Sequence, residues 1–249
     1  MLLYDKNGRE ISDWRGWTRP KEDYQWKAGR SAMELARSWF TAPQPVLPAE
    51  VRELLDSHPD TRDAQLVKGW PEKVTKLPYP GEGRNHDLVA VGKAGERRML
   101  LAVEGKVDEP LGDLLGAYWR KSKRSEKSKA WKRIDALLDA AFGPSALATS
   151  KPYSELRYQL LTALVGTAIE AELQECHFAV LCIQEFVTES ANLDKIKANA
   201  DDLSAFIRTL GARPPKPGGL AGPFPVQVPG SERIVPVLIG KAQFRWAAR

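Results

Sequence analysis

Cysteine is scarce in this sequence: the 249 residues include only Cys176 and Cys182. Their spacing matches no zinc or redox motif. Two thiols cannot build a disulfide framework, so the composition favours a protein of the reducing cytoplasm. We expect both cysteines to be buried.

Long hydrophobic runs are also missing. No apolar stretch approaches the roughly 20 residues of a membrane helix. The first residues, MLLYDKNGREISDW, lack the pattern of a cleavable signal. We therefore expect no membrane partner. The excess of one charge sign is small as well, since 37 Lys and Arg face 32 Asp and Glu, a net charge of +5. That balance is compatible with a nucleic-acid partner without indicating one.

Histidine, a common metal ligand, occurs only three times. His58 and His177 have no neighbours in the sequence that suggest a site. His86 precedes Asp87, where it could be a ligand, although a lone histidine at the start of a strand more often makes structural hydrogen bonds. Any metal site is therefore expected to depend on carboxylates.

What is present is the composition of an ordinary globular chain, 43% hydrophobic and 28% charged. We interpret residues 31–249 as a single α/β domain that follows an aromatic N-terminal extension, residues 1–30. The extension contains Trp14, Trp17 and Trp26, with Tyr24. Packing of these rings on the core is the favoured interpretation, and a stacking surface for nucleic-acid bases is the alternative.

The most informative stretch is residues 82–109, which predicts a β-hairpin. Two apolar runs, residues 87–91 and 98–106, flank a turn at residues 92–96 that contains glycine. If the turn is centred between Gly95 and Glu96, Val91 faces Leu100 and Val89 faces Ala102.

The same register would bring charged groups together at the open end of the hairpin. Asp87 would face Glu104, and Lys106 would project on the same side as Glu104. Directly opposed carboxylates repel each other. A divalent cation between them would remove the repulsion, because magnesium prefers one or two carboxylates with water and phosphate. Lys106 could then hold a phosphate or orient a water, as metal-assisted phosphodiester hydrolysis requires. The short pattern leaves open a simpler interpretation, namely solvated charges at a strand end.

Asp87 followed by Glu104-Gly105-Lys106 at the end of the next strand resembles the PD-(D/E)xK nuclease superfamily. Asn85-His86 stands where the proline of that name would be, a position that varies in the superfamily. The resemblance covers about 25 residues directly, and the chain as a whole also resembles bacterial proteins without an assigned function. It implies a restriction-endonuclease-like core, a central mixed β-sheet flanked by helices in the order helix, strand, hairpin, helix, strand, with helical insertions. It also implies Mg²⁺ or Mn²⁺ held by Asp87, Glu104 and the carbonyl oxygen of Gly105.

Residues 31–40 predict a helix, with Ser31 and Glu34 spaced as a capping box. Superfamily members commonly begin their core with such a helix, and its glutamate often reaches the metal site. The resemblance therefore makes Glu34 an accessory catalytic candidate, in competition with its capping role.

A basic insertion is expected at residues 111–142. Cations in its centre are the candidates for nucleic-acid binding, because such a run can contact phosphates without reading sequence. The alternative is a solvated helix face. The candidate residues are Lys121, Lys123, Arg124, Lys127 and Lys129.

The remaining pattern completes the expected fold. It predicts a helix at residues 48–56, a polar segment with turns at 57–71 and a first strand at 73–77. A long helix at 153–174 precedes a buried strand at 177–187, and Arg157 and Gln159 on that helix resemble an auxiliary position of the superfamily. Another helix is expected at 193–210, then a Pro/Gly-rich loop at 213–230 and closing strands at 233–244.

The leading hypothesis is a magnesium-dependent nuclease with Asp87, Glu104 and Lys106 as its centre. The expected partner is nucleic acid, with DNA placed before RNA. Two alternatives stay open: a nuclease-fold protein that binds nucleic acid or protein without catalysis, and hydrolysis of a phosphoester outside nucleic acid. The sequence leaves the oligomeric state open, a homodimer among the choices.

Overall fold

The protein is described here by a computed structural model that covers residues 1–20 and 25–245. Tyr24 of the N-terminal extension lies outside the described residues, as do residues 246–249.

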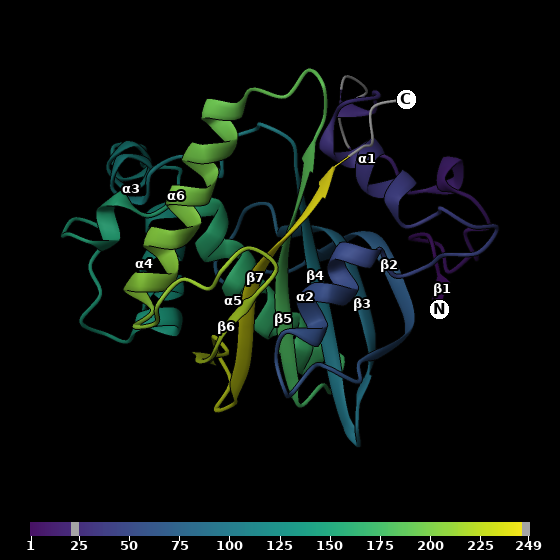
Figure 1. The fold of residues 1–249 in the computed structure, drawn as a ribbon. Coiled ribbons are helices and arrows are strands. Elements are labelled where there is room, and N and C mark those ends of the chain that lie inside the picture. The colour runs from purple at the N-terminus through teal and green to yellow at the C-terminus, as the bar shows by residue number, and fades with distance from the viewer. Residues whose placement is uncertain (21–24, 246–249) are drawn as a thin grey trace.

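A seven-stranded mixed sheet forms the centre of the molecule (Figure 1). Its order is β1-β2-β3-β4-β5-β7-β6. Neighbouring strands are parallel for β1/β2, β4/β5 and β5/β7 and antiparallel for β2/β3, β3/β4 and β6/β7. The strands are β1 (Leu2–Leu3), β2 (Gln65–Thr75), β3 (Arg84–Ala94), β4 (Arg97–Lys106), β5 (Phe178–Val187), β6 (Leu220–Gln227) and β7 (Ile234–Arg245).

Helices cover both faces of this sheet and enclose two apolar cores. One core contains the buried side chains of α3 to α6, and the other contains those of α1 and α2 with Leu3, Ile11 and Trp17 of the N-terminal segment. Figure 1 shows α3, α4 and α6 clustered together, away from α1 and α2. The helices are α1 (Ser31–Ser38), α2 (Ala49–Asp56), α3 (Leu115–Lys123), α4 (Ala130–Phe142), α5 (Tyr158–Leu173) and α6 (Leu193–Thr209), with short 3₁₀ turns at Trp14–Gly16 and Tyr153–Glu155.

This architecture confirms the α/β class and the mixed sheet flanked by helices. Cys176 and Cys182 are both buried, as expected. Within the described part of the chain, no helix combines the length and apolar character needed to cross a membrane.

Two predicted boundaries are wrong for the same physical reason. The first long strand is Gln65–Thr75, although residues 57–71 were expected to be polar turns. Strand β6, Leu220–Gln227, lies inside the expected loop at 213–230. Both strands lie at or near an edge of the sheet. There polar residues and prolines are tolerated, so pairing with a neighbour decides the structure where the hydrophobic pattern is weak.

The capping box at α1 is also wrong. The N-cap is Arg30, and Ser31 is already the first helical residue. Glu34 does accept a backbone hydrogen bond, but from Gly29 at 2.6 Å. The chain therefore enters the helix one residue earlier than the Ser-x-x-Glu spacing indicates.

Candidate active site

The β3–β4 hairpin has the predicted register. Val91 pairs with Leu100 and Val89 with Ala102. The turn is shorter than expected, because the strands extend to Ala94 and Arg97 and leave only Gly95 and Glu96 between them. Gly95 has a φ of 55°, a conformation that glycine adopts at little cost.

This register brings Asp87 beside the end of β4. Strand pairing extends to Leu88 and Val103, and beyond it the amide of Gly105 donates a hydrogen bond to Asp87 Oδ2 at 2.7 Å. Asp87, Glu104, Gly105 and Lys106 all line the same cleft. The structure therefore brings together the central residues that the sequence indicated.

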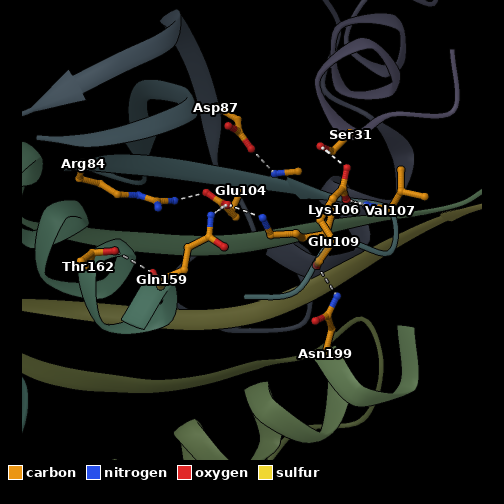
Figure 2. Close-up of polar contacts among 11 residues, drawn as sticks. Ser31, Arg84, Asp87, Glu104, Lys106, Val107, Glu109, Gln159, Thr162 and Asn199 are labelled. Atoms are coloured by element: carbon orange, nitrogen blue, oxygen red, sulfur yellow. Dashed lines mark hydrogen bonds and ion pairs between the residues drawn. The ribbon is translucent and has the colours of Figure 1, made fainter. Parts of the chain in front are cut away.

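Glu104 is the most heavily bonded group of the site (Figure 2). Its Oε1 accepts from Lys106 Nζ at 2.9 Å and from Gln159 Nε2 at 2.5 Å. Its Oε2 accepts from the guanidinium of Arg84. Glu104, Arg84 and Lys106 are all buried. Gln159, on α5, was considered only as an auxiliary residue, and Arg84 was missed.

The two carboxylates have opposite electrostatic surroundings. Burial opposes ionisation of Glu104, but Arg84 and Lys106 hold its pKa below the ordinary value. Burial raises the pKa of Asp87 well above its usual range, and repulsion from Glu104 and Glu72 adds to that effect. Asp87 is consequently the carboxylate that gains more from an added cation.

Glu72 on β2 is a further acidic group that the sequence analysis missed. Its φ is 52°, which is uncommon for a residue other than glycine. Lys73 Nζ lies 5.7 Å from the centre of the Trp70 ring, so two side chains three residues apart share one face of the strand. Strict alternation would place them on opposite faces. The backbone thus departs from regular strand geometry between Trp70 and Lys73, where Glu72 borders the cleft.

Burial raises the pKa of Glu72 to about 7, and repulsion from Glu104 contributes. A hydrogen bond from Asn85 opposes this rise. The sequence could not have singled out Glu72, because β2 was expected to begin after it.

The cleft has a volume of about 1600 Å³. Its lining includes acidic residues of β2, β3 and β4, with Glu109 just beyond β4. It also includes the cationic residues Arg19, Arg30, Lys127 and Lys129. Cationic side chains around a cleft favour the approach of a polyanion.

The basic run is therefore divided. Lys127 and Lys129 line the cleft, whereas Lys121, Lys123 and Arg124 are not among the described residues that do. Lys123 Nζ lies 4.6 and 4.4 Å from the ring centres of Trp119 and Trp131. This lysine packs between two indole rings, a cation–π arrangement that fixes α3 against the start of α4.

Glu34 is the one catalytic candidate that is directed elsewhere. Besides Gly29, its carboxylate faces Arg37 Nη1 at 3.5 Å, and it is not among the described residues that line the cleft. Glu109 instead joins α1 to the cleft, since its Oε1 accepts from Ser31 Oγ at 3.2 Å and its Oε2 from the Val107 amide at 2.9 Å. The position of Glu109 three residues after Lys106 was the available signal, but the sequence analysis assigned it no role.

The histidines do not supply metal ligands to this site in the described part of the chain. Burial lowers the pKa of His86 well below its usual value, and its neighbour across the helix interface is Gly166 of α5. His177 accepts a hydrogen bond from the Arg98 amide at 2.9 Å. Across residues 1–20 and 25–245, no group of three or more His, Cys, Asp and Glu side chains is arranged to hold a metal ion.

The donor chemistry nevertheless fits a hard divalent cation. Asp87 and Glu104 supply carboxylate oxygens to the cleft lining, and the partly buried Asp87 forms no ion pair with a basic side chain in the described part of the chain. Glu104 Oε2 would first have to be released by Arg84. These residue types suit a cation, but both oxygens of Glu104 already have partners in the structure.

Comparison with known proteins gives a family without a transferable activity. No curated protein matches the chain, and no solved structure does. The family model described as "Domain of unknown function (DUF6946)" matches residues 8–243, and the chain therefore belongs to that family.

Proposed function

We propose that the protein is a metal-dependent phosphodiesterase that cleaves nucleic acid, with DNA as the first substrate to test. The observation that carries this proposal is the convergence of Asp87, Glu104 and Lys106 on one cleft whose lining also includes arginine and lysine side chains. The order of α1, β2, the β3–β4 hairpin, α5 and β5 agrees with the restriction-endonuclease-like core that the sequence resemblance implies.

Each residue has a distinct part in this reaction. Asp87 and Glu104, with the Gly105 carbonyl oxygen, would hold Mg²⁺ or Mn²⁺. The cation supplies positive charge that stabilises the negative charge developing on the phosphate. The ammonium group of Lys106, held 2.9 Å from Glu104 Oε1, donates hydrogen bonds to the attacking water or to a phosphate oxygen. Gln159 keeps Glu104 oriented, and Lys127 and Lys129 bind flanking phosphates.

A binding module without catalysis is the second candidate, and one observation favours it. Both oxygens of Glu104 already have partners, so the carboxylate is satisfied without a metal. A buried carboxylate in such a network can be purely structural.

One experiment separates the two. Purified protein is incubated with labelled single- and double-stranded DNA and RNA, with Mg²⁺ or Mn²⁺, against a chelator control. Cleavage that needs the metal and falls by about 10²–10⁴-fold in Lys106→Met would support the nuclease. The control is Lys241→Met, assayed under conditions where its unfolding curve shows it folded, because Lys241 forms a similar ion pair with Glu185 at 3.0 Å outside the cleft lining. Nucleic-acid binding without cleavage under any metal condition would favour the binding module.

A further inference from the structure

Arg84 lies at the start of β3, next to Gly166 of helix α5. Its side chain is 7% exposed and pairs with Glu104. A Cβ added to Gly166 of α5 would come within 2.9 Å of Arg84 Cγ and 3.1 Å of its Cβ. A glycine in the middle of a helix therefore gives the aliphatic stem of Arg84 its room. Arg84 is one of the residues that line the cleft.

The hydrogen-bonding capacity of this guanidinium is only partly used. Arg84 Nε is buried and lacks a hydrogen-bond partner in the described part of the chain. A buried donor without a partner costs free energy, so such a group indicates a missing acceptor. Phosphate suits this role, because a guanidinium can offer it two parallel N–H donors.

Glu104 is arranged so that it can lose Arg84 and stay in place. Lys106 and Gln159 both bind Oε1, whereas Arg84 binds Oε2. Departure of Arg84 would free only Oε2, which would then be the Glu104 oxygen available to a cation. The lysine and the amide would continue to hold the carboxylate.

The backbone that carries Arg84 is fixed by a second arginine. Arg133 of α4 donates to the carbonyl oxygens of Pro78, Tyr79 and Glu82 at 3.1, 3.1 and 2.8 Å. This clamp anchors the loop that leads into β3, so a shift of the Arg84 guanidinium needs side-chain rotation alone.

We propose that Arg84 binds the phosphate at the reaction centre, and that in the free protein it occupies the Glu104 oxygen needed by the cation. On arrival of a phosphodiester, the guanidinium exchanges Glu104 Oε2 for phosphate oxygens, and the cation site becomes complete. This inference rests on the proposed function. It makes cation binding and nucleic-acid binding mutually dependent, since each would strengthen the other by the same factor.

The test is calorimetric titration of Mn²⁺, with and without a DNA oligonucleotide carrying phosphorothioate linkages that is checked to be intact afterwards. In wild type, the oligonucleotide should tighten Mn²⁺ binding about tenfold, within the usual 5–150-fold range of such coupling. In Arg84→Met, Mn²⁺ should bind about tenfold more tightly without DNA, and the oligonucleotide should add almost nothing. A purely structural arginine would not remove the coupling.

Arg157→Met is the matched control. Unlike Gln159, the auxiliary candidate Arg157 does not bind Glu104: it pairs with another partly buried carboxylate, Asp202, at 2.8 Å. It is also not among the described residues lining the cleft. This variant should keep the wild-type coupling. If Arg84→Met does not fold, Arg84→Lys takes its place, and its coupling should fall at least threefold because a lysine lacks the two parallel donors.

Two results would overturn the inference, and they differ in what else they overturn. Wild-type coupling in a folded Arg84 variant, together with intact metal-dependent cleavage by wild type, would reject the role of Arg84 alone. Absence of Mn²⁺ binding in wild type, or binding unaffected by Asp87→Asn, would reject the cation site and with it the proposed function.

Discussion

Two buried glutamates on neighbouring parallel strands have similar partners and different surroundings. Glu104 of β4 is bound by Arg84, Lys106 and Gln159. Glu185 of β5 is bound by Lys241 at 3.0 Å and by Gln243 at 2.7 Å. The strand register even places Lys106 beside Glu185, so the two networks are adjacent.

The difference lies in what else is near. Glu104 borders the cleft with Asp87 and Glu72 close enough to repel it, whereas Glu185 is not among the described residues of the cleft lining. A buried carboxylate with a lysine is therefore a weak indicator of function by itself. The additional acids and an opening toward substrate distinguish the candidate site from the structural pair.

The largest expected effect is a loss of unfolding free energy. This loss should be greater when the Glu185–Lys241 pair is broken than when Lys106 is removed. Lys241→Met leaves Glu185 with Gln243 as its remaining partner and should cost about 3–5 kcal/mol of unfolding free energy. Lys106→Met should cost only about 1–2 kcal/mol, because Arg84 and Gln159 still bind Glu104. Denaturant unfolding of both variants measures the difference. Equal losses would mean that the two networks are energetically alike.

Metal-induced stabilisation should depend on one glutamate and not the other. At a hundredfold excess over Kd, Mn²⁺ should stabilise wild type by about 2.7 kcal/mol. Asp87→Asn and Glu104→Gln should lose most of this gain, and Glu185→Gln should retain it. In a chelator, Asp87→Asn should melt no lower than wild type, because it removes a charge that its surroundings disfavour. Equal metal shifts in all variants would place the cation elsewhere.

Stability should also respond to pH through Glu72. Its folded pKa of about 7 lies above the ordinary 4.5, so the native state binds more protons than the unfolded chain between these values. The unfolding free energy should therefore fall as pH rises from about 4.5 to about 7, by about 2 kcal/mol after allowance for partial exposure. Glu72→Gln should reduce this decrease and leave the part that is due to Asp87, whose pKa is also raised. Glu185→Gln should keep the whole decrease. Unfolding curves at pH 5 and 8 in a chelator provide the measurement, and parallel profiles for wild type and Glu72→Gln would contradict it.

The smallest expected effect is on the salt dependence of DNA binding. It compares the basic residues that line the cleft with those that do not. Replacing Lys127 and Lys129 with Ala should lower the log–log salt slope of duplex DNA binding by about 1.8, since each phosphate contact contributes about 0.9. Replacing Lys121 and Arg124 removes the same charge outside the cleft lining and should leave the slope unchanged. Equal slopes in the two double variants would show that the cleft does not select among these cations.

The sequence was sufficient for the parts of the site that depend on local pattern. The position of the turn between Gly95 and Glu96 determined the hairpin register, and therefore the meeting of Asp87 with the end of β4. Helical spacing located α5 and α6 to within a few residues.

The sequence could not predict contacts between segments that lie far apart along the chain. Arg84 pairs with Glu104, which is twenty residues away in the sequence. The Arg84 side chain fits there only because Gly166 of α5 leaves space for it. Glu72 reaches the cleft only because the β2 backbone departs from alternation. Lys123 is bound by two tryptophans, one before and one after it, and a charge count could not separate it from Lys127.

The irregularity at Glu72 has a second consequence, for association between molecules. Strand β1 pairs with β2 only at Lys68 and Gly69. The rest of that edge of β2 is not paired with β1. Pro71 cannot donate a backbone hydrogen bond there, and the φ of 52° at Glu72 turns the next peptide out of line. At the opposite border, β6 contains Pro223 and Pro225. Both borders are therefore poor templates for adding a strand from another chain, which protects the sheet against edge-to-edge aggregation.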